Sequence, residues 1–472
     1  MIRLLNAYFP SRTIFLGVSE ACLVTLAFLV ATVLRFGKDD ATVMLRYEQG
    51  LFKILVVAGV FITCMYYFDL YDTSILSNRR EVTIRLIQVP GIMCIFLAAI
   101  YYLFPQLKLG RGITIIGLLF VLVALIVWRG LFFALNGQPQ FAQRTMIFGD
   151  EPFVSRLHRE LGSRPELGVR VIGHVLPAGK GSFDFLSKLP SGTVRSEGKI
   201  NESEFLEAIE QQRVSRIIIA LEDRRERLPL ELLLHMKSHG MVIQDGAELY
   251  EQITGKIPIE SLRLGTLLFS SGFRVSQFLV IYKRMASIMV SIFGLLLGLP
   301  VLPFVALAIK LSSPGSLLYK QKRTGKDNKT FYCYKFRTMR ADAEADTGPT
   351  WAGDEDPRIT KVGHFLRMSR LDEIPQLWNV LRGDMSLVGP RPERPEFIEW
   401  LQKEIPYYNL RHTVRPGITG WAQIRYKYGN TVEDTREKLR YDLFYIKNMS
   451  PGLDVLVLFD TVKTILLRRG AK

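Results

Sequence analysis

The hydrophobic residues of this sequence are concentrated in long, nearly uncharged stretches close to the N-terminus. Four such stretches precede residue 136, and they cover Ile14 to Leu34, Leu51 to Leu70, Leu86 to Phe104 and Ile113 to Leu135. Each approaches the roughly 20 residues that a helix needs to cross the hydrocarbon core of a bilayer. We therefore expect residues 1–140 to form a bundle of four transmembrane helices.

The pattern changes near residue 142, where short apolar segments alternate with amphipathic ones. Strands are predicted at 144–150, 168–175, 215–220 and 241–244, and helices at 152–161, 205–212 and 228–239. Strands that alternate with helices are typical of a parallel sheet with helices on both faces. The prediction is a Rossmann-like α/β domain at 141–262, followed by a linker at 263–282.

Nucleotide binding is the first function to consider for this middle domain. The turn after its first strand, however, contains Gly149 followed by Asp150, Glu151 and Pro152. It lacks the GxGxxG spacing that lets backbone amides approach a pyrophosphate, and two acidic side chains would repel a phosphate. We therefore favour a structural or regulatory role for the domain.

A fifth apolar stretch, Met285 to Ile309, is long enough to span a membrane but contains Pro300 and Pro303. Each proline removes a helical amide and clashes with the preceding turn, so we expect a helix break near these residues. Basic residues at both ends can reach the same membrane surface. This favours a re-entrant helix at 283–311 that enters one leaflet and returns. A kinked helix that crosses the bilayer is the alternative.

Charge and the rarer residue types narrow the choice of partner. The chain has 472 residues, too many for one core, and carries a formal charge of +16 with four Cys and six His. Basic surfaces attract nucleic acid or anionic lipid, and the apolar stretches favour membrane lipid and no nucleic acid. Without a CxxC pair or a metal-ligand spacing, we expect a reduced compartment and no structural zinc.

Single charged residues bear on the membrane arrangement. Arg79, Arg80 and Arg85 make the connection after the second stretch the most basic one, which places it and both chain ends in the cytoplasm. Glu20 lies inside the first stretch, where acids often have functional partners, although a snorkelled or bundle-facing carboxylate is an equal alternative. The apolar stripe of Leu453 to Leu467 predicts a helix that lies on the membrane or packs against the C-terminal region.

Two candidate phosphate-binding cations occur in a strand-like segment of the C-terminal region. Lys335 and Arg337 are two residues apart, so their side chains share one face of a strand. Two cations on one face suit a diphosphate. A solvated strand face would show the same pattern, so this pair alone decides nothing.

The strongest candidate for chemistry is the adjacent carboxylate pair Asp372 and Glu373. A helix is expected to begin close to them, because Pro375 is tolerated only in a first helical turn, and Gly383 provides the stop. The positive end of a helix keeps a carboxylate ionised and attracts anions. Such a pair can bind Mg²⁺ with substrate phosphate oxygens, and an aspartate can attack phosphorus directly. The alternative is that the pair merely favours a helix N-terminus.

Rigidly placed arginines strengthen the functional interpretation of the pair. Proline on both sides of Arg391 fixes the local backbone, and a guanidinium group suits bidentate phosphate contact. Arg367 precedes the acidic pair by five residues and is placed to meet a second phosphate. Arg415 begins a further Arg-Pro-Gly turn, whose exposed amides suit a nucleotide.

With these motifs, the region from Lys283 onward resembles the bacterial sugar transferase family, the monotopic phosphoglycosyl transferases that begin exopolysaccharide and O-antigen assembly. The matching segments, in family order, are Ala308-Ile-Lys310, Ser313-Pro-Gly315, Lys335-Phe-Arg337, Asp356-Pro-Arg358, Leu371-Asp-Glu-Ile-Pro-Gln-Leu377, Leu387-Val-Gly-Pro-Arg-Pro392 and Arg415-Pro-Gly417. The four N-terminal stretches and the middle domain resemble the long form of these enzymes. Tyr250 to Val275 is similar to the branch found with exosortase-linked exopolysaccharide clusters.

The resemblance implies an activity and a role for each site residue. Asp372 would be the nucleophile, forming a covalent sugar-phosphoryl aspartate and releasing UMP from a UDP-sugar. Glu373 would complete the dyad, Mg²⁺ would be required, and Arg367 and Arg391 would contact phosphate. The long form handles hexose-1-phosphate, and the acceptor would be undecaprenyl (polyprenyl) phosphate at the bacterial inner membrane. The catalytic domain, residues 283–472, would face the cytoplasm.

Two other classes of protein remain as alternatives. One is a non-catalytic membrane scaffold or sensor, whose middle domain responds to a metabolite. The other is a polytopic transferase built of spanning helices, which the few apolar stretches after residue 136 disfavour. A homodimer is compatible with the sequence, and the identity of the sugar cannot be read from it.

Overall fold

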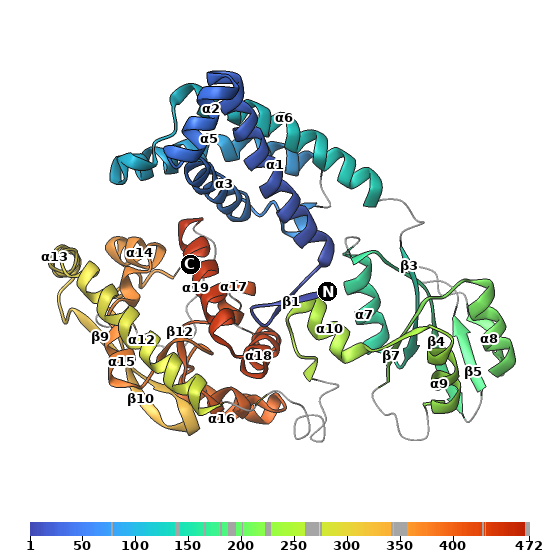
Figure 1. Ribbon diagram of the computed structural model, residues 1–472. Helices are drawn as coiled ribbons and strands as arrows, with labels where there is room; N and C mark the ends of the chain where they lie inside the picture. Colours follow the sequence, from blue (N-terminus) through green and yellow to red (C-terminus); the bar gives the residue numbers. More distant parts are fainter. Residues whose placement is uncertain are drawn as a thin grey trace. The chain divides into compact units, whose positions relative to one another are not determined.

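The chain, drawn as a computed structural model in Figure 1, forms two compact units. One unit contains residues 1–2 and 9–249, and the other contains residues 3–8 and 250–472. The structure describes residues 1–76, 79–136, 142–164, 167–179, 182–186, 195–200, 202–221, 228–259, 273, 276–340, 343, 356–426, 429 and 431–467. Most of the segment 250–275 that resembles the exosortase-linked branch, from residue 260 on, lies outside the described residues.

The first unit begins with long apolar helices. Each of the four predicted stretches lies largely within one of them, and the helices are α1 (Ser11–Phe36), α3 (Gly50–Tyr67), α5 (Arg79–Leu103) and α6 (Arg111–Asn136). Short elements link them: α2 (Lys38–Tyr47), α4 (Thr73–Leu76) and η1 (Pro105–Leu107). Together with α12 of the second unit, five described helices are long and apolar enough to cross a membrane. The chain is a membrane protein.

Glu20 faces the interior of this bundle. Its two carboxylate oxygens accept hydrogen bonds from Arg129 of α6, over 2.6 Å from Nε and 3.1 Å from Nη2. Both side chains are almost completely buried. Because an unpaired charge in an apolar bundle is costly, this pair fixes α1 against α6. The bundle-facing interpretation of Glu20 is confirmed.

A six-stranded sheet follows the bundle, in the order β6-β5-β4-β3-β7-β8. Its predicted strands are present as β3 (Gln143–Gly149), β4 (Val169–Gly179), β7 (Arg216–Ala220) and β8 (Val242–Asp245), all parallel. The predicted helices are α7 (Phe153–Gly162), α8 (Glu202–Gln211) and α9 (Leu230–Ser238). The sequence patterns did not predict β5 (Ser182–Leu186) and β6 (Arg195–Ile200), which extend the sheet in antiparallel fashion, nor α10 (Gly246–Thr254).

Gly149 has a packing role at the end of β3. A Cβ atom at this position would lie 2.2 Å from the carbonyl oxygen of Ala220 on the neighbouring strand. Only glycine therefore allows β3 and β7 to approach this closely. The glycine of the first turn is explained by strand packing, without a bound phosphate.

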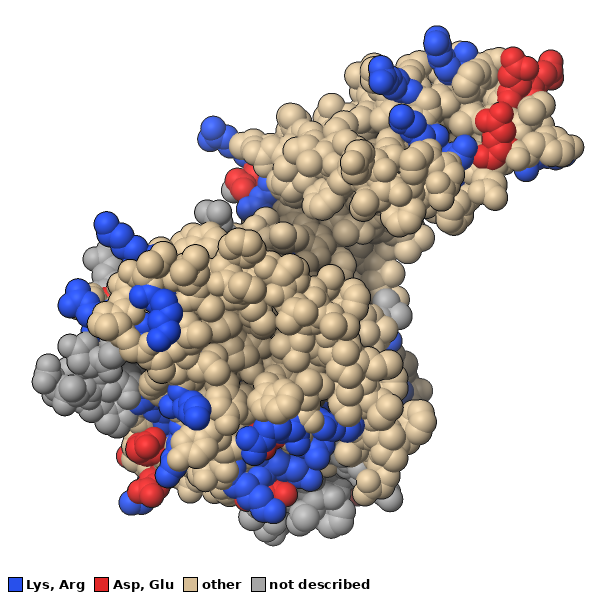
Figure 2. All heavy atoms as spheres, turned by 90° about the vertical axis from the view of Figure 1, so that its left-hand side faces the viewer, with Lys and Arg blue, Asp and Glu red and all other residues tan. Residues whose placement is uncertain are grey.

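The second unit contains a helix that is broken where the prolines predict. Helix α12 (Gln277–Gly298) ends before a turn at 299–301, and α13 (Leu302–Ser312) carries Pro303 as its second residue. Pro300 lies in the turn itself. Apolar side chains along both helices are exposed, and charged residues are sparse over much of the face in Figure 2 that carries these helices.

The rest of the second unit consists of short elements arranged around two small sheets. Strands β9 (Leu318–Thr324) and β10 (Thr330–Phe336) pair antiparallel, and β11 (Ser386–Val388) pairs parallel with β12 (Gly417–Thr419). A further two-stranded sheet joins β1 (Ile2–Leu4) and β2 (Ala7–Phe9). The helices are α14 (Lys361–Met368), α15 (Gln376–Arg382), α16 (Pro395–Glu404), α17 (Trp421–Arg425), α18 (Val432–Lys447) and α19 (Pro451–Leu466).

Helix α19 has both an inner and an outer apolar face. Leu453 and Val457 are fully buried in the second unit, whereas Val455 and Val462 are about half exposed. The stripe therefore packs against the C-terminal region and still presents apolar side chains to its surroundings.

Candidate active site

The two predicted catalytic carboxylates lie on a 3₁₀ turn, Leu371–Glu373, rather than in an α-helix. Helix α15 begins only at Gln376, after Pro375, and ends at Gly383, whose φ of 94° is the left-handed stop expected from the sequence. Arg370, with a left-handed φ of 57°, separates this turn from α14. The carboxylates therefore precede the α-helix, and its N-terminal dipole contributes less to the site than the sequence pattern indicated.

The turn is anchored by the apolar residues on either side of the carboxylates. Leu371 and Ile374 pack into a core built by Val305 and Ile309 of α13 and by Leu366 of α14. The second half of the broken helix therefore supports the turn directly. A second contact comes from α12, where a Cβ atom on Gly294 would lie 3.1 Å from Cδ1 of Leu377.

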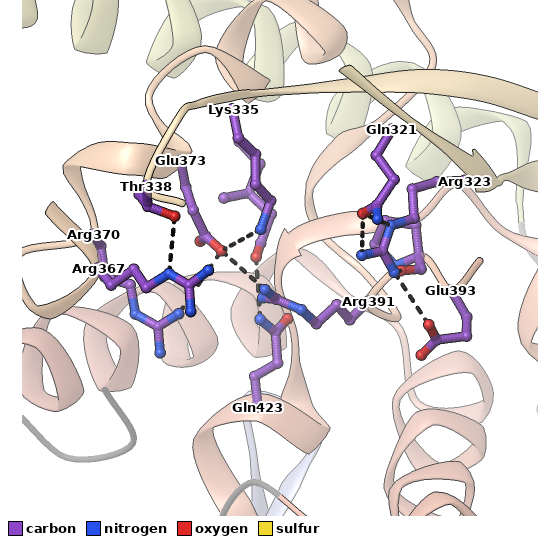
Figure 3. A network of polar contacts seen from close by, with 12 residues as sticks. Gln321, Arg323, Lys335, Thr338, Arg367, Arg370, Glu373, Arg391, Glu393 and Gln423 are labelled. Carbon is purple, nitrogen blue, oxygen red and sulfur yellow. Dashed lines mark hydrogen bonds and ion pairs between the residues drawn. The ribbon is translucent and has the colours of Figure 1, made fainter. Parts of the chain in front are cut away.

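Glu373 is surrounded by three cations (Figure 3). Its Oε1 atom lies 3.0 Å from Nη2 of Arg391, 3.3 Å from Nζ of Lys335 and 3.8 Å from Nη1 of Arg370. Burial would raise the pKa of Glu373, but these cations outweigh it and hold the pKa well below its usual range. Glu373 therefore stays ionised and keeps a Lys and two Arg side chains together.

Asp372 differs from its neighbour in forming no ion pair with any residue that the structure describes. The residue is 7% exposed, and its Oδ1 atom is buried without a hydrogen-bond partner in the described part of the chain. Burial, followed by the charge of Glu373, raises the pKa of Asp372, while the nearby cations moderate the rise. Adjacent carboxylates whose pKa values are shifted in opposite directions are typical of catalytic sites.

Arg391 is held in place by other side chains that donate hydrogen bonds to the backbone at this position. Arg411 donates from Nη2 to the carbonyl oxygen of Arg391 over 2.8 Å and pairs with the buried Asp442 at 2.9 Å. Arg323 donates to the carbonyl oxygen of Pro392 over 3.0 Å. The rigid presentation expected from the flanking prolines is thus reinforced by two buried or half-buried arginines.

The other predicted phosphate ligands lie in different places. Arg367 donates from Nε to Thr338 Oγ1 over 3.0 Å and interacts electrostatically with Asp372. Arg337 instead donates to the carbonyl oxygens of Ser313 and Pro314, over 2.7 and 2.9 Å. Strand β10 ends at Phe336, so the alternation that placed Lys335 and Arg337 on one face no longer applies at Arg337.

Arg415 is engaged at the far end of α15. Its Nε donates to the carbonyl oxygen of Gly383 over 3.0 Å, where it satisfies a carbonyl group at the helix terminus. The structure therefore brings Lys335 and Arg391 to Glu373 and places Arg367 within electrostatic reach of Asp372. It does not bring Arg337 or Arg415 to the dyad.

Two residues of the site were missed by the sequence patterns. Arg370 directly precedes the acidic turn, and this adjacency was the only available signal. Asn379 is fully buried, donates to the carbonyl oxygen of Tyr332 over 2.7 Å and accepts from the amide of Tyr334 over 3.0 Å. It ties α15 to the strand that carries Lys335. A polar residue within the apolar helix segment of α15 was its sequence signal.

A cavity of about 220 Å³ adjoins the dyad. Arg370 and Glu373 line one end of it. Its remaining lining residues are mostly apolar or threonine and come from the start of α15, from β12, α17 and α19: Ile374, Leu377, Ile418, Thr419, Gln423, Ile424, Thr461, Thr464 and Ile465.

Part of the chain matches a known protein family. Residues 278–468 match the family described as Bacterial sugar transferase. An "Exopolysaccharide production protein PSS" from Rhizobium leguminosarum bv. phaseoli is 43% identical over 194 residues, which cover 40% of this chain and 97% of that protein. The chain belongs to the bacterial sugar transferase family. The matched region of this chain, residues 278–468, contains Asp372 and Glu373, the three cations around Glu373 and the cavity.

Two further members of the family show how much of the chain is shared. A protein named "UDP-N-acetylgalactosamine-undecaprenyl-phosphate N-acetylgalactosaminephosphotransferase" from Aeromonas hydrophila is 43% identical over 228 residues, 48% of this chain and 52% of that protein. This chain therefore spans about half the length of the Aeromonas hydrophila protein. A "UDP-glucose:undecaprenyl-phosphate glucose-1-phosphate transferase" from Xanthomonas campestris pv. campestris is 29% identical over 496 residues, 99% of this chain and 96% of that protein.

Proposed function

We propose that the chain transfers a hexose-1-phosphate from a UDP-sugar to undecaprenyl phosphate, or another polyprenyl phosphate, and releases UMP. The observation that carries the proposal is the buried Asp372 carboxylate, with an unpartnered oxygen beside a cluster of cations. Family membership and the names of the relatives support the reaction class. Within that class, exopolysaccharide or O-antigen assembly is the expected pathway.

In the first step, a carboxylate oxygen of Asp372 attacks the sugar-bearing phosphorus of the UDP-sugar. The bond from this phosphorus to the bridging oxygen breaks, and UMP leaves with the electron pair. Lys335, Arg370 and Arg391 are close enough to the carboxylate pair to neutralise charge on the phosphoryl oxygens. Glu373 has a positioning role, because its charge holds these three side chains together.

In the second step, a phosphate oxygen of the lipid attacks the phosphorus bound to Asp372. The bond between the aspartate oxygen and phosphorus breaks, which restores the carboxylate and forms the lipid diphosphate sugar. Two displacements at one aspartate separate the encounter with a water-soluble donor from the encounter with a membrane-bound acceptor.

The residues present fit a magnesium site at Asp372 and Glu373. Mg²⁺ is commonly held by one or two carboxylates with substrate phosphate oxygens and waters. Asp372 offers a free oxygen, and the described residues contain no group of three or more His, Cys, Asp or Glu that would hold an ion alone. When bound, the ion would neutralise phosphate charge. The requirement is a proposal and rests on this fit.

The length of the uncharged part of α12, after Lys283 and Arg284, and the length of α13 support a re-entrant helix at 283–311. From Met285 to the end of α12 at Gly298 the helix rises about 21 Å, and the 11 residues of α13 rise about 16 Å. Each of these two uncharged lengths falls short of the roughly 30 Å hydrocarbon core, whereas the whole of α12, with the residues before Met285, is long enough to cross it. We therefore propose that the chain enters and leaves by the cytoplasmic face of the bacterial inner membrane.

The finer domain assignment is part of the same proposal. The parallel sheet supports a Rossmann-like domain over 141–262, a linker at 263–282 and a catalytic domain over 283–472. With the four N-terminal helices, this would be the long form of the family. A homodimer remains a prediction, which the mass of the detergent-solubilised protein would test.

Replacing the carboxylate of Asp372 by an amide of nearly the same shape tests the proposed function. The variant Asp372→Asn, in membranes supplied with Mg²⁺ and a panel of UDP-sugars, is expected to lose UMP release by at least about 10³-fold. Asp327→Asn is the matched control, because Asp327 is exposed and asparagine tolerates its left-handed backbone. Mass spectrometry should find a sugar-phosphate adduct on Asp372 of the parent protein. Undiminished turnover in Asp372→Asn would overturn the role of Asp372, and no UMP release from the parent protein would favour the scaffold alternative.

A further inference from the structure

The cavity beside Glu373 has a charged end and an apolar end. At the charged end lie Arg370 and Glu373, and Gln423 points toward the same group of cations (Figure 3). The amide of Gln423 donates to the carbonyl oxygen of Ile418 over 3.3 Å, whereas its Oε1 atom is buried without a hydrogen-bond partner in the described chain. This end therefore combines positive charge with an unused acceptor.

The remaining wall is apolar, even where its residues are threonines. Thr461 and Thr464 donate their hydroxyl groups to carbonyl oxygens of α19 itself, Val457 and Asp460, over 2.7 and 2.9 Å. Their polar groups are thus satisfied within the helix. The wall formed with the isoleucines of the lining is suited to hydrocarbon.

The elements that form this wall also carry exposed apolar surface. Ile374 and Leu377 pack against Gly298 and Gly294 of α12, the apolar helix that ends in the proline break. On α19, Val462 and Leu466 are exposed beside the lining residues of the same helix. The cavity wall is thus built on elements that pack against an apolar helix or present apolar side chains on their outer faces.

The volume of the cavity limits which ligands can enter it. At about 30 Å³ for each water, about 220 Å³ exceeds a single ion or water. It is smaller than the roughly 300 to 1,000 Å³ typical of sites that enclose a whole small-molecule ligand. A space of this size suits one end of a longer molecule, with a phosphate at the charged side and hydrocarbon at the other.

We propose that this cavity receives the first isoprene unit of the polyprenyl phosphate acceptor and so directs its phosphate toward Asp372. The inference rests on the proposed function and adds the binding site of the second substrate. A protonated oxygen of the acceptor phosphate is the donor that Gln423 Oε1 lacks. The reaction at this site is the second displacement described above, in which the acceptor oxygen bonds to phosphorus and the aspartate oxygen leaves.

A cavity-filling variant separates acceptor binding from the first step. Thr464→Phe should fill the apolar end, raise the KM for a prenyl phosphate and lower kcat/KM for it at least about tenfold. The burst of UMP formed from UDP-sugar and Mg²⁺ without acceptor should remain, which also shows that the variant is folded. Val462→Phe, on the outer face of the same helix, is the matched control and should retain the acceptor kinetics of the parent.

A second variant, Ile424→Phe, fills the cavity from α17 and should reproduce the effect of Thr464→Phe. Unchanged acceptor kinetics in both variants would overturn the inference. So would a raised KM for the UDP-sugar with unchanged acceptor kinetics, since the donor would then occupy the cavity. Failure of the proposed function is distinguishable, because the parent protein itself would then show no UMP burst.

Discussion

The Asp372 side chain is expected to reduce the stability of the fold. Its buried Oδ1 has no hydrogen-bond partner among the described residues. Burial together with Glu373 raises the pKa of Asp372 above its value in the unfolded chain, so the ionised side chain that predominates above the raised pKa costs folding free energy. Asp372→Asn removes the charge and should raise the Tm by about 2 °C or more in magnesium-free buffer at neutral pH. Thermal unfolding measures the change. A lower Tm than the parent would contradict this account of the site.

The raised pKa of Asp372 also predicts how activity depends on pH. Protonation of Asp372 begins at a higher pH than for an ordinary aspartate, because its pKa is raised, whereas the lowered pKa of Glu373 keeps that group ionised. The rate of the UMP burst should fall with unit slope as the pH drops through the pKa of Asp372.

The variant Glu373→Gln is the control for this assignment. Removing the neighbouring negative charge lowers the pKa of Asp372, so the acid limb of the residual activity should move to lower pH. An acid limb that stays in place would show that another group titrates.

At the scale of elements, glycine determines how closely α12 approaches α15. A Cβ atom on Gly294 would lie 3.1 Å from Leu377 Cδ1, so Gly294→Leu must push the two helices apart. Overpacking of this kind typically costs about 1–3 kcal/mol, and the displaced turn should also slow UMP release. Gly91→Leu in α5 is the matched control, since nothing lies within 4 Å of a Cβ atom there. Equal Tm values for both variants would contradict the close packing.

Neighbouring elements also explain why the acidic turn depends on the broken helix. Leu371 and Ile374 share a core with Val305 and Ile309, so α13 and the acidic turn are parts of one packed cluster. Asn379 then connects α15 to the strand that carries Lys335. The position of the dyad is thus set jointly by an apolar helix and a small sheet.

For the whole molecule, the path of the chain through the bilayer decides where the chemistry happens. Single cysteines introduced as Ser276→Cys and Lys310→Cys, in a background without the four native cysteines, bracket the broken helix. In inner-membrane vesicles of known orientation, a membrane-impermeant maleimide should label both from the same side. Labelling from opposite sides would show a full crossing and remove the re-entrant proposal.

Local patterns were sufficient to predict most elements and part of the site. The apolar stretches and the alternating segments anticipated the long helices and parallel strands, because periodicity and length act within one element. The short strands β5 and β6 were not predicted, since β5 is placed by its pairing with β4, and β6 by its pairing with β5. Lys335 and Arg391, which were predicted to bind phosphate, lie beside Glu373, whereas Arg337 and Arg415 contact main-chain carbonyl groups elsewhere.

By itself, the sequence determined that this is a membrane protein with a broken apolar helix and an acidic pair among arginines, because charge, proline and hydrophobic length are properties of short segments. Only the tertiary structure decided that Glu373 carries the ion pairs, while Oδ1 of Asp372 has no hydrogen-bond partner among the described residues. The reason is that their environments are built by residues up to 38 positions away in the chain, from β10 to the segment after β11. No local pattern encodes such contacts.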